Sequence, residues 1–110
     1  MPRMSDQAFS VAANAVSVNV LSGLLHEFLD RPAELVLAAA SSAVGIRSTL
    51  IIGGQVVLND SFISQANRFP LIPDDIAAQE QGIGRMILTF RNTTGAALTV
   101  NWLLDVTYLT

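Results

Sequence analysis

The stretch ALTVNWLLDVTYL, residues 97–109, alternates between apolar and mixed positions along its whole length. Its even-numbered positions are all large and apolar or aromatic, namely Leu98, Val100, Trp102, Leu104, Val106 and Tyr108. Successive side chains of a β-strand point to opposite faces, so these six would line one face and Thr99, Asn101 and Asp105 the other. The pattern predicts the principal core strand of an antiparallel sheet.

Two glycines join a second pair of apolar runs. Residues 46–52 and 55–59 are rich in β-branched and aliphatic side chains, and Gly53-Gly54 separates them. Glycine supplies the positive φ that tight hairpin turns need, so a β-hairpin is predicted here. Asn92-Thr-Thr-Gly95 predicts a further turn, between a strand at 85–91 and the strand at 97–109.

Less regular segments complete the expected strands. Residues 16–23 alternate valine with serine or asparagine and predict a strand. Residues 34–42 are predicted as strand despite three alanines, because the run is short and has no helical charge pattern. Residues 24–29 suit either a short helix or a strand, with strand preferred, and Arg31-Pro32 is expected to end that element.

Residues 60–84 are expected to form a long excursion outside the centre of the sheet, since Pro70 and Pro73 cannot donate to a strand ladder. Asp74-Asp75 predicts the cap of one short helix within it. The glycines at 82 and 84 would then release the chain into the strand at 85–91.

The predicted fold is therefore all-β: an antiparallel β-sandwich, jelly-roll-like, with six to eight short strands and at most one short helix. Residues 1–12 precede any clear period and hold the isolated Phe9, so they are expected to form a flexible arm. Residues 13–110 are expected to form a single sandwich domain, as suits a chain of this length.

The composition is too apolar for an ordinary freely diffusing monomer. Apolar residues make up 51% of the chain and charged residues 14%, with a mean hydropathy of +0.48, whereas an average domain is roughly 25% charged. The longest uncharged run, residues 7–25, is interrupted by serine and asparagine and does not predict a membrane span. We expect the surplus apolar surface and exposed strand edges to be covered by copies of the chain or by other proteins.

Several function classes are disfavoured. The chain has no cysteine, so disulfides and thiolate chemistry are excluded. Its net charge is −3 and its six cationic residues are scattered arginines, which gives no basic stripe for direct nucleic-acid binding. His26 and Glu27 would face opposite sides of a strand and could not easily act together. We expect no catalytic site, metal site or cofactor, and, without a recognisable signal peptide, a cytoplasmic protein unless it belongs to a particle.

Apolar residues gathered in the excursion, together with Phe9, are the candidate interface. They would form an adhesive patch if exposed, because aromatic and aliphatic anchors carry most interface energy, or cap one end of the sandwich if they fold back. The set is Phe9, Phe62, Ile63, Phe69, Pro70, Leu71, Ile72 and Pro73.

These features resemble the small β-sandwich and jelly-roll subunits of viral and bacteriophage particles, including decoration or cement proteins. The resemblance rests on the polar arm, the Gly53-Gly54 hairpin, the proline-containing excursion and the closing Asn92-Thr-Thr-Gly95 turn, together with high apolar and low lysine content. It implies a structural role in the virion, with trimers or other symmetric clusters forming or coating a larger protein shell. No functional residue is carried over.

An alternative from another class is a carbohydrate- or small-ligand-binding module. Trp102 or Tyr108 would then stack on a sugar, although both lie on the predicted apolar face of the last strand, where a core role is the simpler expectation. Scattered carboxylates are the only features that would suit an enzyme.

Overall fold

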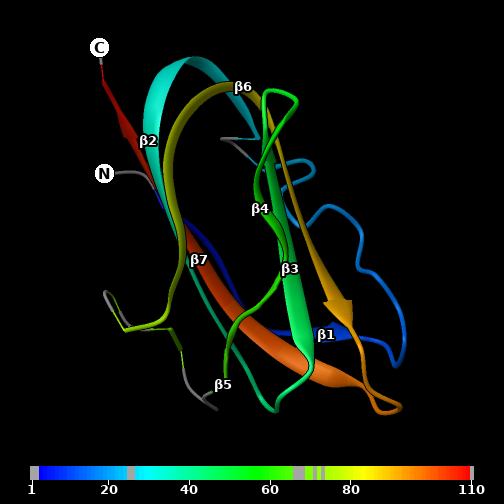
Figure 1. The fold of residues 1–110 in the computed structure, drawn as a ribbon. Coiled ribbons are helices and arrows are strands. Elements are labelled where there is room, and N and C mark those ends of the chain that lie inside the picture. Colours follow the sequence, from blue (N-terminus) through cyan, green and yellow to red (C-terminus); the bar gives the residue numbers. More distant parts are fainter. Residues whose placement is uncertain (1–2, 25–26, 66–68, 71, 73, 110) are drawn as a thin grey trace.

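The fold, seen in a computed structural model (Figure 1), is described for residues 3–24, 27–65, 69–70, 72 and 74–109. These residues form seven strands and no helix. The strands are β1 (Arg3–Val11), β2 (Phe28–Ser41), β3 (Ile46–Ile52), β4 (Gln55–Phe62), β5 (Ser64–Gln65), β6 (Ile76–Asn92) and β7 (Leu98–Tyr108).

The strands are hydrogen-bonded in the order β1-β7-β2-β6-β3-β4, and all of these pairings are antiparallel. The short β5 runs parallel to the end of β2. The long strand β6 belongs to two sheets, because residues 76–85 pair with β2 and residues 86–92 pair with β3. Figure 1 shows β6 arching over from the side of β2 to the side of β3. We name the layer of β1, β7, β2 and the first part of β6 sheet A, and the layer of the second part of β6, β3 and β4 sheet B.

A loop segment, residues 14–20, completes sheet B along the outer edge of β6. Val16 forms an isolated antiparallel bridge with Arg91, Ser17 N donates to Phe90 O at 2.8 Å, and Val20 N donates to Leu88 O at 2.9 Å. Sheet A thus runs β1-β7-β2-β6, and sheet B runs from this segment through β6 and β3 to β4. Two facing sheets of four members in this order make up a jelly roll. The predicted all-β antiparallel sandwich is confirmed.

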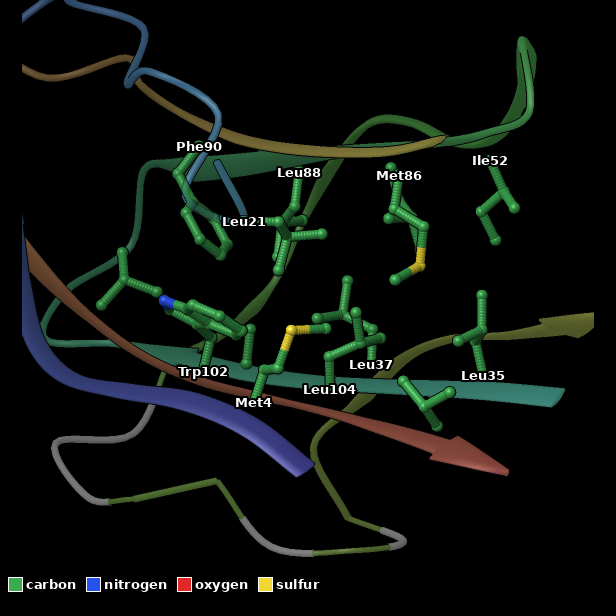
Figure 2. Close-up of a cluster of buried hydrophobic side chains, with 14 of the residues drawn as sticks. Met4, Leu21, Leu35, Leu37, Ile52, Met86, Leu88, Phe90, Trp102 and Leu104 are labelled. Atoms are coloured by element: carbon green, nitrogen blue, oxygen red, sulfur yellow. The ribbon is translucent and has the colours of Figure 1, made fainter. Parts of the chain in front are cut away.

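The core lies between the two sheets (Figure 2). Alternate side chains of β2 and β7, such as Leu37 and Trp102, point from sheet A toward Met86, Leu88 and Phe90 of sheet B. Burial alternates along β3 in the same way, with Ile46, Ser48, Leu50 and Ile52 buried. The predicted hairpin at Gly53-Gly54 and the predicted core strand at 97–109 are confirmed, the latter as β7.

The predicted flexible arm is wrong, because residues 3–11 form β1 and pair with β7. Met4 and Val11 are buried in the core, opposite Leu104 and Leu98 respectively. A register shift between Asp6 and Phe9 changes which positions face inward. This β-bulge interrupts the alternation on which strand prediction depends.

Residues 16–23 do not form the predicted strand but lie in the loop between β1 and β2. Val16 and Val18 are exposed, at 59% and 76%, while the side chains of Ser17 and Asn19 bond to the backbone of β6. Residues 25–26, inside the ambiguous run 24–29, lie outside the described residues, and β2 begins at Phe28.

Three further boundaries differ from prediction. Arg31-Pro32 does not end an element but lies inside β2, at a register shift between Leu29 and Ala33 where a missing N–H is tolerated. Asp74-Asp75 does not cap a helix, because the chain turns there and β6 begins at Ile76. Gly82 and Gly84 lie inside β6, where it leaves β2.

Candidate functional site: two sheet faces

The outer face of sheet B is built from rows of residues that oppose one another across the strands. Ile51 lies opposite both Val56 and Ile87. Further along, Arg47 lies opposite both Phe62 and Arg91. Paired residues of neighbouring strands share a face, so this face has an aliphatic end and an end built on arginine and phenylalanine.

Apolar side chains on this face are open to solvent. Val56 and Phe62 are each 57% exposed, and Val16 and Val18 extend the exposed surface along the loop that borders β6. A cluster of exposed apolar side chains on one side of a small domain indicates a contact surface.

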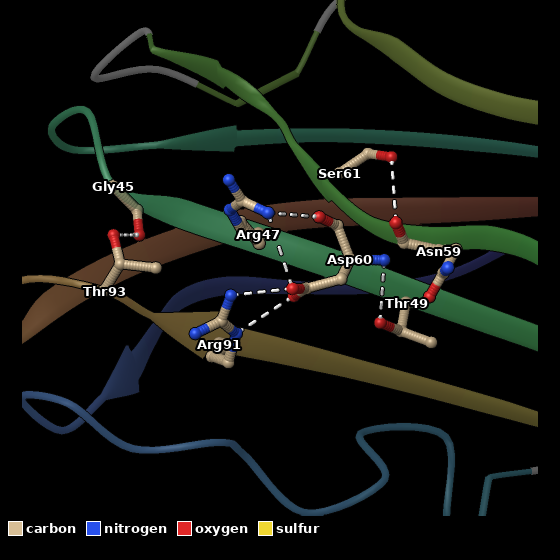
Figure 3. Close-up of polar contacts among 8 residues, drawn as sticks. All are labelled: Gly45, Arg47, Thr49, Asn59, Asp60, Ser61, Arg91 and Thr93. Carbon is tan, nitrogen blue, oxygen red and sulfur yellow. Dashed lines mark hydrogen bonds and ion pairs between the residues drawn. The ribbon is translucent and has the colours of Figure 1, made fainter.

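A network of two arginines and an aspartate holds the polar end of this face (Figure 3). Arg91 donates to Asp60 from two of its three guanidinium nitrogens, Nε to Oδ1 at 3.0 Å and Nη2 to Oδ2 at 2.7 Å. Arg47 Nη1 donates to the Asp60 carbonyl at 3.1 Å. The Arg91 hydrogen bonds hold the pKa of Asp60 below its ordinary value, and Arg47 adds to the effect. The same contact raises the pKa of Arg91. Two guanidinium groups thus share one carboxylate.

Asp60 has a positive φ of 49°, which is uncommon for a residue other than glycine. Its N–H donates to Thr49 Oγ1 at 3.1 Å, beside a register shift between Ser48 and Leu50 of β3. A second shift follows between Leu50 and Ile51. Irregularities of this kind disfavour the addition of another strand to the edge formed by β4.

Two other edges of the sandwich are also irregular or covered. β1 has the shift between Asp6 and Phe9, and residues 14–20 cover the outer edge of the second part of β6. Contacts with other proteins are therefore favoured at the faces of the sheets over these three edges.

The outer face of sheet A contains a hollow of about 360 Å³. Its floor is a row in which Asp105 of β7, Val36 of β2 and Gln79 of β6 oppose one another. The complete lining consists of Glu34, Val36, Ile72, Ile76, Gln79, Asp105 and Thr107. A smaller polar hollow of about 240 Å³ adjoins it, sharing Glu34 and Gln79 and extending to Glu80 and Gln81.

Asp105 is held in place from β1. The Arg3 guanidinium donates from Nε to Oδ1 at 2.6 Å and from Nη2 to Oδ2 at 3.0 Å, and Asp105 is only 6% exposed. This bidentate hydrogen bonding raises the pKa of Arg3. The carboxylate of Asp105 is thus committed to Arg3 and fixes one wall of the hollow.

Several described carboxylates that pair with no described arginine lie around the same hollow. Each of the five described arginines forms an ion pair: Arg3 with Asp105, Arg31 with Asp30, Arg47 and Arg91 with Asp60, and Arg85 with Glu27. Among the described residues, no arginine pairs with Glu34, Glu80 or Asp74. Glu34 and Glu80 line the two hollows, and Asp74 lies in the turn between Ile72 and Ile76. The surface near the hollow is therefore acidic.

Those predicted interface residues that the structure describes do not lie together in one patch. Phe9 packs against the core, with its ring centroid 6.5 Å from that of Phe90, and Ile63 is half-buried against the same core. Phe62 is exposed on sheet B beneath the Arg47 guanidinium, and Ile72 is exposed at the hollow of sheet A.

The rest of the predicted set lies in the excursion. Phe69 is half-buried and Pro70 is buried. Leu71 and Pro73 lie outside the described residues.

The aromatic residues proposed for sugar stacking are not open platforms. Trp102 is 1% exposed within the core, and Tyr108 is half-buried with the Arg31 guanidinium 4.3 Å from its ring centroid. His26 lies outside the described residues, while Glu27 is buried and accepts hydrogen bonds from Arg85 Nε and Gly23 N. Glu27 therefore has a structural role.

The hollow was missed at the level of sequence because its residues come from three strands and a turn. One signal was present: Asp105 is the sole charged residue of the strongest predicted strand, at residues 97–109, and Val36 lies two positions from Glu34 on what became the outward face of β2. Neither position indicates a hollow until the register between β2, β6 and β7 is known.

Within the described ranges, no group of three or more histidines, cysteines or carboxylates is arranged to hold a metal ion. No helix among those residues is long and apolar enough to cross a membrane. No protein-family model matches the chain, and no curated protein is significantly similar to it.

Proposed function

We propose that this protein is a structural component of a virus or bacteriophage particle, either a shell subunit or a decoration protein, which acts through contacts with other protein subunits. The observation that carries the proposal is the outer face of sheet B, where Val16, Val18, Val56 and Phe62 are each more than half exposed. Burial of exposed apolar side chains against a partner removes apolar surface from water and so stabilises the complex.

The size of this face limits what one contact can do. β3 has seven residues, and with about 3.3 Å per residue and about 4.8 Å between four neighbouring chains the face measures roughly 23 by 19 Å, or about 440 Å². Stable complexes bury about 800 Å² per partner. One such contact is therefore weak, and a stable assembly needs each subunit to be held at more than one surface, as in a symmetric cluster or on a shell.

The fold supports the same proposal by analogy. Jelly rolls occur in viral capsid proteins, and also in lectins and cupins. Since a fold alone does not define a function, the analogy carries less weight than the exposed face. In this chain the space between the sheets is filled by side chains such as Trp102 and Phe90, which directs attention to the outer surfaces.

The test is the molar mass of the purified protein by multi-angle light scattering over a concentration series. We expect mass to rise with concentration, and the double variant Val18→Asp and Val56→Asp to remain monomeric, because charges would be placed where apolar contact forms. Val44→Asp is the matched control, since Val44 is 65% exposed in the turn between β2 and β3, outside this face. A monomeric wild-type protein at every concentration would overturn self-association through this face.

A further inference from the structure

We infer that the hollow on the outer face of sheet A binds an extended, basic and aliphatic segment of a different protein, not a second copy of this chain. The inference rests on the proposed function, because it names the chemistry of a second contact that a shell-associated protein would make. It is carried by the lining of the hollow and by the distribution of unpaired charge.

The lining favours an aliphatic side chain. Val36, Ile72 and Ile76 contribute the apolar part of a space of about 360 Å³, which is at the lower end of the roughly 300 to 1,000 Å³ range of binding pockets. Ile72 is 45% exposed, although it lies beside other apolar groups. A partner side chain in the hollow would cover this apolar surface.

The rim favours a cation. The smaller hollow continues from the larger one past Glu34 and Gln79 to Glu80. Glu34 accepts a hydrogen bond from Gln79 Nε2 at 3.2 Å, and Glu80 accepts one from Gln81 N at 3.0 Å, so each is fixed in place while its charge is not neutralised by a described arginine. An arginine or lysine side chain of a partner would supply the missing opposite charge.

The charges of the residues that the structure describes also disfavour a second copy as the occupant. The chain has no lysine, and each of its five described arginines is already paired with a carboxylate of its own molecule. To place Arg3 of another copy in the hollow, for example, would strip the buried Asp105 of its partner, which is costly. A partner with uncommitted basic residues has no such cost.

The arrangement also favours an extended segment. Both hollows lie along neighbouring strands of one sheet face, and alternate side chains of an extended chain lie about 6.6 Å apart on the same side. An aliphatic residue in the larger hollow would therefore place a basic residue that lies two positions along the segment, on the same side, near Glu34. Main-chain strand addition is not required for this contact.

The probe is the capped pentapeptide Arg-Ser-Val-Ser-Arg, whose valine and two arginines share one side when the chain is extended, titrated into ¹⁵N-labelled protein and followed by NMR. We expect progressive shifts of the amides of Val36, Gln79 and Thr107, weakening as salt rises because surface charges are screened. The double variant Glu34→Gln and Glu80→Gln should weaken binding at least threefold. Asp30→Asn is the control of matched chemistry, since Asp30 is exposed and is not part of either hollow.

A blocking variant makes the test independent of charge at the rim. Val36→Arg would place a guanidinium in the hollow itself and should abolish the shifts, while the emission of the buried Trp102 confirms that the core is intact. Equal shifts with the matched acidic pentapeptide Glu-Ser-Val-Ser-Glu, or equal weakening by Asp30→Asn and the double variant, would overturn the inference. Shifts of the same amides by soluble glycans in place of the basic peptide would overturn it in favour of a carbohydrate site.

The proposed self-association and the proposed peptide binding can be tested independently of each other. The variant with Val18→Asp and Val56→Asp alters sheet B alone, so it should bind the peptide as the wild type does. Peptide binding by a strictly monomeric protein would overturn self-association and support the hollow. Concentration-dependent assembly without peptide binding would overturn the hollow and support self-association.

Discussion

Arg3 and Asp105 are 102 positions apart in the sequence and form a bidentate ion pair on the outer face of sheet A. Arg3 side-chain atoms are half exposed, whereas the Asp105 side chain is only 9% exposed. The pair fixes the first strand of the chain to the last and holds a wall of the hollow. It also explains why residues near the amino terminus belong to the folded domain.

Loss of Arg3 should destabilise the protein. Arg3→Ala leaves the buried Asp105 carboxylate without its principal partner. We therefore expect the free energy of unfolding to fall by about 1 to 3 kcal/mol. Urea denaturation followed by Trp102 fluorescence measures the change. Arg31→Ala is the control, because Arg31 lies 4.0 Å from an exposed carboxylate and should cost far less. Equal losses from the two variants would contradict a special role for the Arg3 pair.

The Asp60 network should make stability depend on acid pH. The pKa of Asp60 is lowered in the folded state by Arg91 and Arg47, so its contribution is present above the unfolded pKa of about 4 and is lost as pH falls through the folded value. We expect Asp60→Asn to be less stable than wild type at pH 7, and the difference to shrink on acidification. Asparagine tolerates positive φ, so the variant tests the charge and not the backbone.

Denaturation midpoints at neutral and acid pH check this expectation. The matched control is Asp30→Asn, whose carboxylate is exposed and lies 4.0 Å from Arg31. A difference between wild type and Asp60→Asn that stays constant from pH 7 to pH 2 would contradict the ionic role of Asp60.

The two glycines of the β3–β4 hairpin should respond differently to alanine. Both have positive φ, 57° at Gly53 and 85° at Gly54. A Cβ at Gly53 would collide with the carbonyl oxygen of Ile83, whereas one at Gly54 would meet open space. We expect Gly54→Ala to lower the free energy of unfolding by about 1 kcal/mol through backbone strain alone. Gly53→Ala should lower it by about 2 to 4 kcal/mol, because the collision adds to the strain. Thermal melts rank the two variants, and equal melting temperatures would be the contrary result.

Asn19 should protect the outer edge of β6. Its Oδ1 accepts from Leu88 N at 2.9 Å and from Leu21 N at 3.1 Å, and its Nδ2 donates to Met86 O at 3.3 Å. Asn19→Ala leaves those backbone groups without their partner. We therefore expect the free energy of unfolding to fall by about 1 to 2 kcal/mol and aggregation on heating to become faster. Turbidity during a temperature ramp measures the second effect. Ser22→Ala, at an exposed position of the same loop, is the control.

The parts of the fold that sequence predicted are those whose information is local. Residues 97–109 alternate over a long stretch, and Gly53-Gly54 supplies the backbone freedom of a tight hairpin. β1 was missed because its bulge between Asp6 and Phe9 breaks the alternation. Residues 16–23 were wrongly predicted as a strand because valines that alternate with polar residues need not face a core, and here Val16 and Val18 are exposed.

The hollow could not be predicted in the same way. It depends on a register in which Val36 lies between Asp105 and Gln79, and on the turn that carries Ile72 over the face of sheet A. Such pairings are set by contacts between distant parts of the chain. Among the predicted interface residues within the described ranges, Phe62 alone lies on the exposed face of sheet B, at the end of β4.

The double membership of β6 has a mechanical consequence. Ile76 and Gln79 reach the hollow from the first part of this strand, and Ile87 and Arg91 reach the opposite surface of the molecule from its second part. A force applied at one of these surfaces would thus be transmitted to the other along the covalent backbone of β6. It would not depend on the hydrogen bonds between two separate strands, which can break one after another. The two layers would therefore resist pulling together and would separate from each other only when β6 itself unfolds.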